Sequence, residues 1–164
     1  MAEQKNPLFV IEIFYEIHKL NNNTVLWMIG DGELKVKIEN KVKELGLDTC
    51  VELLGYRDDV NDLMMGMDAL IFPSFHEGLS IVLIEAQATG LPVFASDSIS
   101  QEHKISNRLK FISLSSSAEI WADIILKSDD IYKNDNRNQA KIDSCYNINN
   151  VAEEVKRYYV EMLS

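Results

Sequence analysis

Two glutamates, eight positions apart, flank the start of an expected helix. Glu77 precedes an apolar stretch that predicts a helix over residues 79–89, and Glu85 lies about two turns along it. Backbone amides at a helix start lack partners within the helix and carry partial positive charge, so an anion can bind there. The amides in question belong to Leu79, Ser80 and Ile81. A carboxylate accepts two hydrogen bonds at once, which suits the vicinal hydroxyls of a ribose or hexose.

Each candidate also has an explanation that needs no ligand. Glu77 can complement the helix dipole while Glu85 faces solvent. The sequence GDGELK, which starts at Gly30, resembles part of the dinucleotide fingerprint GxGxxG but lacks its third glycine. A tight turn between a strand and a helix explains GDGELK without any ligand. A dinucleotide-binding oxidoreductase domain is a remote alternative function. In the loop 55–57, Arg57 can pair with a neighbouring aspartate.

Composition and charge narrow the class of protein. The chain has 164 residues, of which 46% are hydrophobic and 26% charged, and this predicts one compact domain over residues 1–164. The net charge of −10 repels phosphate backbones, so we expect no nucleic-acid partner. A helix start and a lysine can still bind a small phosphorylated ligand. We find neither a leader pattern nor an apolar run of membrane-spanning length, so we expect a cytoplasmic protein.

Cysteines and histidines are scattered along the chain. They are Cys50, Cys145, His18, His76 and His103. None of the spacings is that of a metal-ligand set, so we expect no metal site. The two cysteines lie far apart in a chain expected in the cytosol, and we expect both thiols to be reduced.

Short apolar runs alternate with amphipathic stretches, which predicts an α/β fold. The expected strands are residues 24–29, 50–54, 69–72, 92–95 and 109–114. The expected helices are residues 7–20, 33–45, 60–67 and 79–89, and a further helix capped by Ser116 and Glu119. The alternation is typical of a Rossmann-like, doubly wound parallel sheet with helices on both faces, which binds ligands beyond the carboxyl ends of its strands.

The C-terminal part differs in composition from this core, which we expect over about residues 6–127. Residues 128–150 form a polar segment rich in Asn and Asp, for which we expect a helix or loop without deep burial. Residues 151–163 are amphipathic and predict a C-terminal helix.

The segment FPSFHEGLSIVLIEAQATGLPVFASD, residues 72–97, resembles the Glu-x7-Glu signature region of family 4 retaining glycosyltransferases, the glycosyl transferases group 1 family. Residues 5–35 and 51–74 are similar to the preceding parts of that family's C-terminal, nucleotide-sugar-binding domain. The similarity covers nearly the whole chain. It implies the C-terminal half of the two-domain GT-B fold. It also implies an enzyme of bacterial capsular or exopolysaccharide biosynthesis, in the cytoplasm or peripheral at the inner face of the membrane.

The resemblance implies roles for single positions. Glu77 matches a family glutamate beside the donor sugar, and Lys5 matches a lysine that neutralises the departing diphosphate; these two are the expected catalytic residues. Without the family, Lys5 would be a solvated terminal residue. Glu85 matches the glutamate that binds the ribose hydroxyls. The other expected donor-binding residues are Gly30, Gly55, Tyr56, Arg57, Ser74, Gly78, Leu79, Ser80 and Ile81.

The sequence departs from the family pattern at its start. The arginine partner of Lys5, the strand that opens the domain and the N-terminal acceptor domain would all precede Met1. In the doubly wound order the absent strand is the central one. We therefore expect the sheet either to close between residues 24–29 and 69–72 or to take a strand from another chain, which makes a homo-oligomer plausible.

The expected function is the donor half of a glycosyltransferase. It would bind a nucleotide-diphosphate sugar as substrate, with a UDP-sugar favoured, and need no metal or other cofactor. The acceptor, a glycan or a lipid-linked sugar, would be held by the absent domain, and the isolated chain would transfer nothing. The alternative is a non-catalytic remnant or nucleotide-sugar-binding module.

Overall fold

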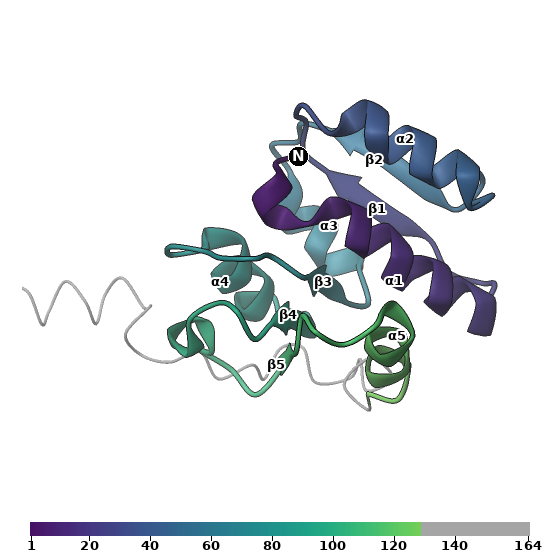
Figure 1. Ribbon diagram of the computed structural model, residues 1–164. Helices are drawn as coiled ribbons and strands as arrows, with labels where there is room; N and C mark the ends of the chain where they lie inside the picture. Colours follow the sequence, from purple (N-terminus) through teal and green to yellow (C-terminus); the bar gives the residue numbers. More distant parts are fainter. Residues whose placement is uncertain (129–164) are drawn as a thin grey trace, which may run out of the picture.

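The computed structural model describes residues 1–128, in which helices and short strands alternate (Figure 1). The strands are β1 (Leu26–Ile29), β2 (Val51–Gly55), β3 (Leu70–Phe72), β4 (Val93–Ser96) and β5 (Leu109–Ile112). The helices are α1 (Pro7–Leu20), α2 (Lys35–Glu44), α3 (Val60–Gly66), α4 (Ile81–Ala88) and α5 (Ala118–Leu126), with 3-10 turns η1 (Glu3–Lys5) and η2 (Gln101–His103). All strands and helices expected in this part of the chain are present. Cys145, the remainder of the polar segment and the helix expected over 151–163 lie outside the described residues.

Local sequence explains where the helices begin. α1 starts at Pro7, whose ring fits the first helical turn, and Asn6 before it takes the left-handed backbone conformation with a φ of 52°. The capping box expected at Ser116 is wrong, because the N-cap residue of α5 is Ser117. A hydrogen bond with Ser117 lowers the pKa of Glu119 in the first turn. The cap therefore lies one residue later than the sequence pattern predicts.

The strands form two parallel sheets instead of one continuous sheet. β1 pairs with β2, and β3, β4 and β5 form the second sheet in that order. The α/β architecture with parallel strands is confirmed. Of the two expected ways to compensate for a missing central strand, closure between residues 24–29 and 69–72 is wrong, because β1 and β3 do not pair. Among the described residues, no strand lies between β1 and β3.

Apolar side chains on both faces of the second sheet hold the helices against it. Consecutive strand residues point to opposite faces, so Val93 packs with Leu83 of α4 whereas Phe94 packs with Trp121 of α5. α1 contributes side chains both to the cluster around β1 and α2 and to the cluster around Trp121. α1 therefore ties the two sheets together, as its position in Figure 1 shows.

Three features of residues 1–128 bear on the class of protein. Cys50 is buried and free, and burial raises the pKa of its thiol. No helix in this part of the chain is long and apolar enough to cross a membrane. In the same residues, no group of three or more His, Cys, Asp and Glu side chains is placed to hold a metal ion.

Candidate functional site

The candidate residues gather at the carboxyl ends of the strands. Gly30 follows β1 and Gly55 ends β2, and the Gly30 amide donates a hydrogen bond of 2.7 Å to the Gly55 carbonyl. Both glycines have positive φ angles, 111° and 66°, which side chains disfavour. The loop 73–80 leaves β3 at the same edge and leads into α4. The edge is where a doubly wound fold binds its ligands.

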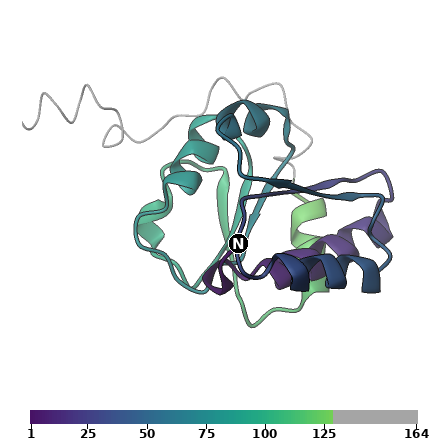
Figure 2. The ribbon, with the colours of Figure 1, turned by 90° about the horizontal axis from the view of Figure 1, so that it is seen from above.

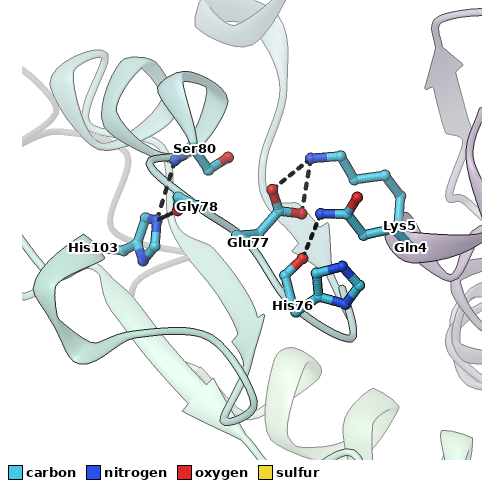
Figure 3. A network of polar contacts seen from close by, with 7 residues as sticks. All are labelled: Gln4, Lys5, His76, Glu77, Gly78, Ser80 and His103. Carbon is cyan, nitrogen blue, oxygen red and sulfur yellow. Dashed lines mark hydrogen bonds and ion pairs between the residues drawn. The ribbon is translucent and has the colours of Figure 1, made fainter.

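The central feature of the site is an ion pair between Lys5 and Glu77, which are 72 positions apart in the sequence (Figure 3). The Lys5 Nζ lies 2.8 Å from both Oε1 and Oε2 of Glu77. The Glu77 side chain is 6% exposed, whereas that of Lys5 is 43% exposed. The Lys5 Nζ also lies 4.9 Å from the centre of the Phe72 ring, within range of a cation–π contact. The two expected catalytic residues are therefore in direct contact.

Two further hydrogen bonds hold η1 against the loop that carries Glu77. The Gln4 Nε2 donates to the His76 carbonyl at 2.7 Å (Figure 3), and the Phe75 amide donates to the Gln4 carbonyl at 2.9 Å. These contacts fix the backbone on both sides of the ion pair. Sequence analysis missed Gln4, since a glutamine at a chain start carries no recognisable signal.

The start of α4 differs from the expected set of free amides. Ser80 is the N-cap, and its amide donates to His103 Nε2 at 3.1 Å. The His103 Nδ1 lies 2.9 Å from the Ser100 carbonyl and donates to it in the tautomer that leaves Nε2 free to accept from Ser80. The same Nε2 lies 2.8 Å from the Gly78 carbonyl, and it can donate there only if it releases the Ser80 amide. The expectation that Ser80 presents a free amide is therefore wrong.

Two other amides remain available at this helix end. Within residues 1–128, the amides of Leu79 and Ile81 have no hydrogen-bond partner, and both side chains are exposed. Glu85 lies within α4 and is half-buried. Ser74 is fully buried, and its Oγ has no partner among the described residues.

A buried glutamine secures the loop that carries His103. The Gln87 Nε2 donates to the His103 carbonyl at 2.7 Å, and its Oε1 accepts from the amides of Ile105 and Ser106. Gln87 is completely buried, so these bonds form away from water. The only signal for Gln87 in the sequence is a polar residue on an otherwise apolar helix face, which the helix pattern alone did not single out.

In the loop after β2, Arg57 pairs with a neighbouring aspartate, as the explanation without a ligand predicts. The Arg57 Nε donates to Asp59 Oδ1 at 2.7 Å, and Arg57 Nη2 bonds the other carboxylate oxygen. These bonds raise the pKa of Arg57 and lower that of Asp59. Tyr56 is exposed. In this structure Arg57 therefore forms an ion pair with Asp59 at the surface. Its expected contact with the base of a nucleotide stays a prediction.

Comparison with known proteins decides the family. Residues 1–127 match the family model described as glycosyl transferases group 1. The chain belongs to this family. EpsF of Bacillus subtilis (strain 168) is 34% identical to this group 1 chain over 129 residues, which are 77% of the chain and 33% of EpsF. The UDP-Gal:alpha-D-GlcNAc-diphosphoundecaprenol alpha-1,3-galactosyltransferase of Escherichia coli is 35% identical over 97 residues, 57% of the chain and 25% of that protein. The chain thus spans a third or less of these relatives.

Solved structures agree with the family. WaaG, a glycosyltransferase involved in lipopolysaccharide biosynthesis, superimposes with a TM-score of 0.70 at 28% identity, covering 82% of this group 1 chain and 36% of WaaG. HepE of Anabaena in complex with UDP gives a TM-score of 0.71 at 20% identity, covering 95% of this chain and 46% of HepE. At 20% identity, the similarity to HepE concerns the fold alone. The expected assignment to part of the GT-B fold is confirmed.

Proposed function

We propose that this group 1 glycosyltransferase chain is the donor-binding half of an enzyme of bacterial polysaccharide biosynthesis. It binds a nucleotide-diphosphate sugar, with a UDP-sugar favoured, and takes part in transfer that retains the configuration of the anomeric carbon. The observation that carries this proposal is the Lys5–Glu77 pair at the carboxyl ends of the strands. The pair places a partly exposed cation beside a carboxylate. In a diphosphate sugar, the phosphate can bind the cation and the sugar hydroxyls can bind the carboxylate.

The chemistry of sugar transfer explains why such a pair is useful. When the bond between the anomeric carbon and the diphosphate breaks, negative charge accumulates on the departing phosphate oxygen. An ammonium group and helix-start amides stabilise that charge. Lys5 can supply the ammonium, and Leu79 and Ile81 carry the free amides. Once Lys5 turns to the phosphate, Glu77 is free to accept hydrogen bonds from sugar hydroxyls.

The same charges make a bound metal ion unnecessary for our proposal. A single lysine and the dipole of α4 lie at the site to balance part of the diphosphate charge. We therefore expect the affinity for UDP to be the same with and without EDTA. A large loss of affinity in EDTA would contradict a metal-independent donor site.

The acceptor side of the proposal rests on the relatives. The named Escherichia coli relative is a galactosyltransferase whose acceptor is a diphosphoundecaprenol-linked sugar. We propose that this chain serves a glycan or lipid-linked acceptor held by an N-terminal domain, in the cytoplasm or at the inner face of the membrane. The isolated chain then transfers no sugar. Gel filtration separately tests whether it forms a homo-oligomer.

A second candidate function is a nucleotide-sugar-binding module without catalysis. The engagement of the Ser80 amide by His103 favours it, because one expected diphosphate donor is occupied. Both candidates bind UDP. Only the first yields product when a complementary acceptor domain is added to the chain in a transfer assay.

Thermal unfolding with ligands tests donor binding. UDP should raise the melting temperature, whereas uridine, which lacks the diphosphate, should raise it much less. Glu85→Ala should reduce the UDP shift because Glu85 is the proposed ribose ligand, and Glu44→Ala, at an exposed position of α2, is the control. If UDP produces no shift in the wild-type chain, both candidate functions are wrong.

A further inference from the structure

The buried ring of His103 lies between two backbone carbonyls. Its Nδ1 is 2.9 Å from the Ser100 carbonyl, and its Nε2 is 2.8 Å from the Gly78 carbonyl. A third backbone group, the Ser80 amide at the start of α4, donates to the same Nε2 at 3.1 Å. The Gly78 carbonyl and the Ser80 amide therefore compete for one nitrogen (Figure 3).

The number of protons on the ring decides this competition. A neutral imidazole has one N–H group, whereas an imidazolium has two. With its proton on Nδ1, the neutral ring donates to Ser100 and accepts from Ser80, and the Gly78 carbonyl gains no hydrogen bond from it. A buried imidazolium needs an acceptor at each nitrogen, and the Ser100 and Gly78 carbonyls supply them. Its Nε2 can then no longer accept from the Ser80 amide.

The surroundings hold the His103 backbone in place, while the loop before α4 has room to adjust. Figure 2 shows α4 and the segment after β4 together, on the opposite side of the molecule from α2. The fully buried Gln87 of α4 donates to the His103 carbonyl at 2.7 Å. Gly78 has open space where a Cβ would lie, and Leu79 is exposed. The backbone between Gly78 and Ser80 can therefore turn the Ser80 amide away from the ring.

Charged side chains near His103 do not bond its ring nitrogens. Within residues 1–128, the partners of Nδ1 and Nε2 are backbone groups. The titratable or charged side chains on the elements packed around the ring are His76 and Glu77 in the loop before α4, Glu85 on α4, and Asp97, Glu102, Lys104 and Arg108 between β4 and β5. The Glu77 carboxylate is bonded to Lys5. His76 is a second histidine in this set, so its own titration needs a separate control.

We propose that His103 is a positioning residue of the donor site and that it releases the Ser80 amide to the diphosphate when it gains a proton. This inference rests on the proposed donor binding. Ser80 lies between Leu79 and Ile81, whose amides have no partner within residues 1–128, so its release gives three consecutive donors at the start of α4. Histidine side chains ordinarily change charge between about pH 5 and pH 8. His103 therefore makes diphosphate binding tighter as the pH falls through this range.

Calorimetry with UDP on the whole 164-residue chain tests this role at about pH 5.5 and about pH 8. His103→Gln keeps a polar amide near the position of Nε2 but does not titrate. The terminal phosphate of UDP titrates too, so the affinity of the wild-type chain is divided by that of the variant at the same pH, which removes this effect. The ratio should rise about fivefold from the higher to the lower pH, because one more amide bonds a charged phosphate. His76→Gln and His18→Gln, the same change at the other two histidines, should follow the wild type at both pH values.

Nuclear magnetic resonance of the wild-type chain tests the exchange of partners without any variant, and it decides alone if His103→Gln does not fold. The resonances of the Ser80 amide and of the His103 ring should shift with the same midpoint as the pH falls. Different midpoints, a constant affinity ratio, or a ratio changed equally by His76→Gln would overturn the role of His103 and leave donor binding intact. No binding of UDP at either pH would overturn the proposed function and this role together.

Discussion

Breaking the Lys5–Glu77 pair should cost stability in a way that depends on which partner is removed. A hydrogen bond to a charged group contributes about 1.5–3 kcal/mol, and an exposed ion pair about 0.2–1 kcal/mol. Lys5 is 43% exposed and Glu77 is 6% exposed, so the pair lies between these classes. We expect Glu77→Gln to lower the free energy of unfolding by about 1.5 kcal/mol, since the lysine left behind can reach water.

The reverse change should cost more. Lys5→Met leaves a buried carboxylate without its cation, and we expect a loss of about 2–3 kcal/mol. The double variant should lose about as much as Lys5→Met alone, which is less than the sum of the two single losses and gives a coupling energy of about 1.5 kcal/mol in a double-mutant cycle. Urea unfolding followed by circular dichroism measures all four proteins. A coupling energy near zero, or a larger loss for Glu77→Gln than for Lys5→Met, would refute the reasoning that a buried Glu77 carboxylate depends on a partly exposed Lys5.

The same pair predicts an unusual effect on ligand binding. Lys5 must leave Glu77 before it contacts a phosphate, so Glu77 competes with UDP for the lysine. In Glu77→Gln, UDP no longer has to break the Lys5–Glu77 ion pair. If this lowers the cost of binding by about 1 kcal/mol, UDP should bind about fivefold more tightly. Binding of a complete UDP-sugar should gain less, because the carboxylate that serves the sugar is lost. Calorimetry on the two variants measures both effects, and weaker UDP binding by Glu77→Gln would contradict the competition.

Three further predictions concern parts of the chain outside this pair. Trp121→Ala should cost about 3–5 kcal/mol because the ring is fully buried, whereas Ile120→Ala, at a half-exposed neighbouring position, should cost far less in the same urea experiment. The pKa of Asp59 is lowered in the folded protein, so ionised Asp59 contributes to the free energy of unfolding. This contribution is complete above the ordinary pKa of an aspartate and is lost as the pH falls through the pKa in the folded protein. Asp59→Asn should therefore flatten the acid side of a plot of the free energy of unfolding against pH. Cys50 should react with a thiol reagent in native protein much more slowly than in urea, measured in Cys145→Ser, because burial raises the pKa of its thiol.

The pattern of the fold could be predicted from the sequence because it depends on local signals. Apolar runs located all five strands, and the spacing of apolar residues together with Pro7 located α1 from its first to its last residue. The boundaries of shorter elements were less exact, and η1 and η2 were not predicted. A three-residue turn contains too few residues to show a period.

The contacts of the candidate site were harder to predict, because they depend on distant residues. Family resemblance singled out Lys5 and Glu77, but nothing in the spacing predicted that they form a bidentate ion pair across 72 positions. The helix pattern predicted a free amide at Ser80, and the buried His103 from a distant loop occupies it. Tertiary packing, not local sequence, determines which polar groups at a helix start remain available.

The most direct test of the account is the dissociation constant for UDP measured by calorimetry in three proteins. They are the wild-type chain, Lys5→Met and Lys37→Met, where Lys37 is an exposed lysine on α2 away from the strand ends. We predict that Lys5→Met weakens UDP binding at least tenfold and that Lys37→Met binds as the wild type does. Equal affinity in all three proteins would contradict the claim that Lys5 receives the diphosphate of a donor sugar.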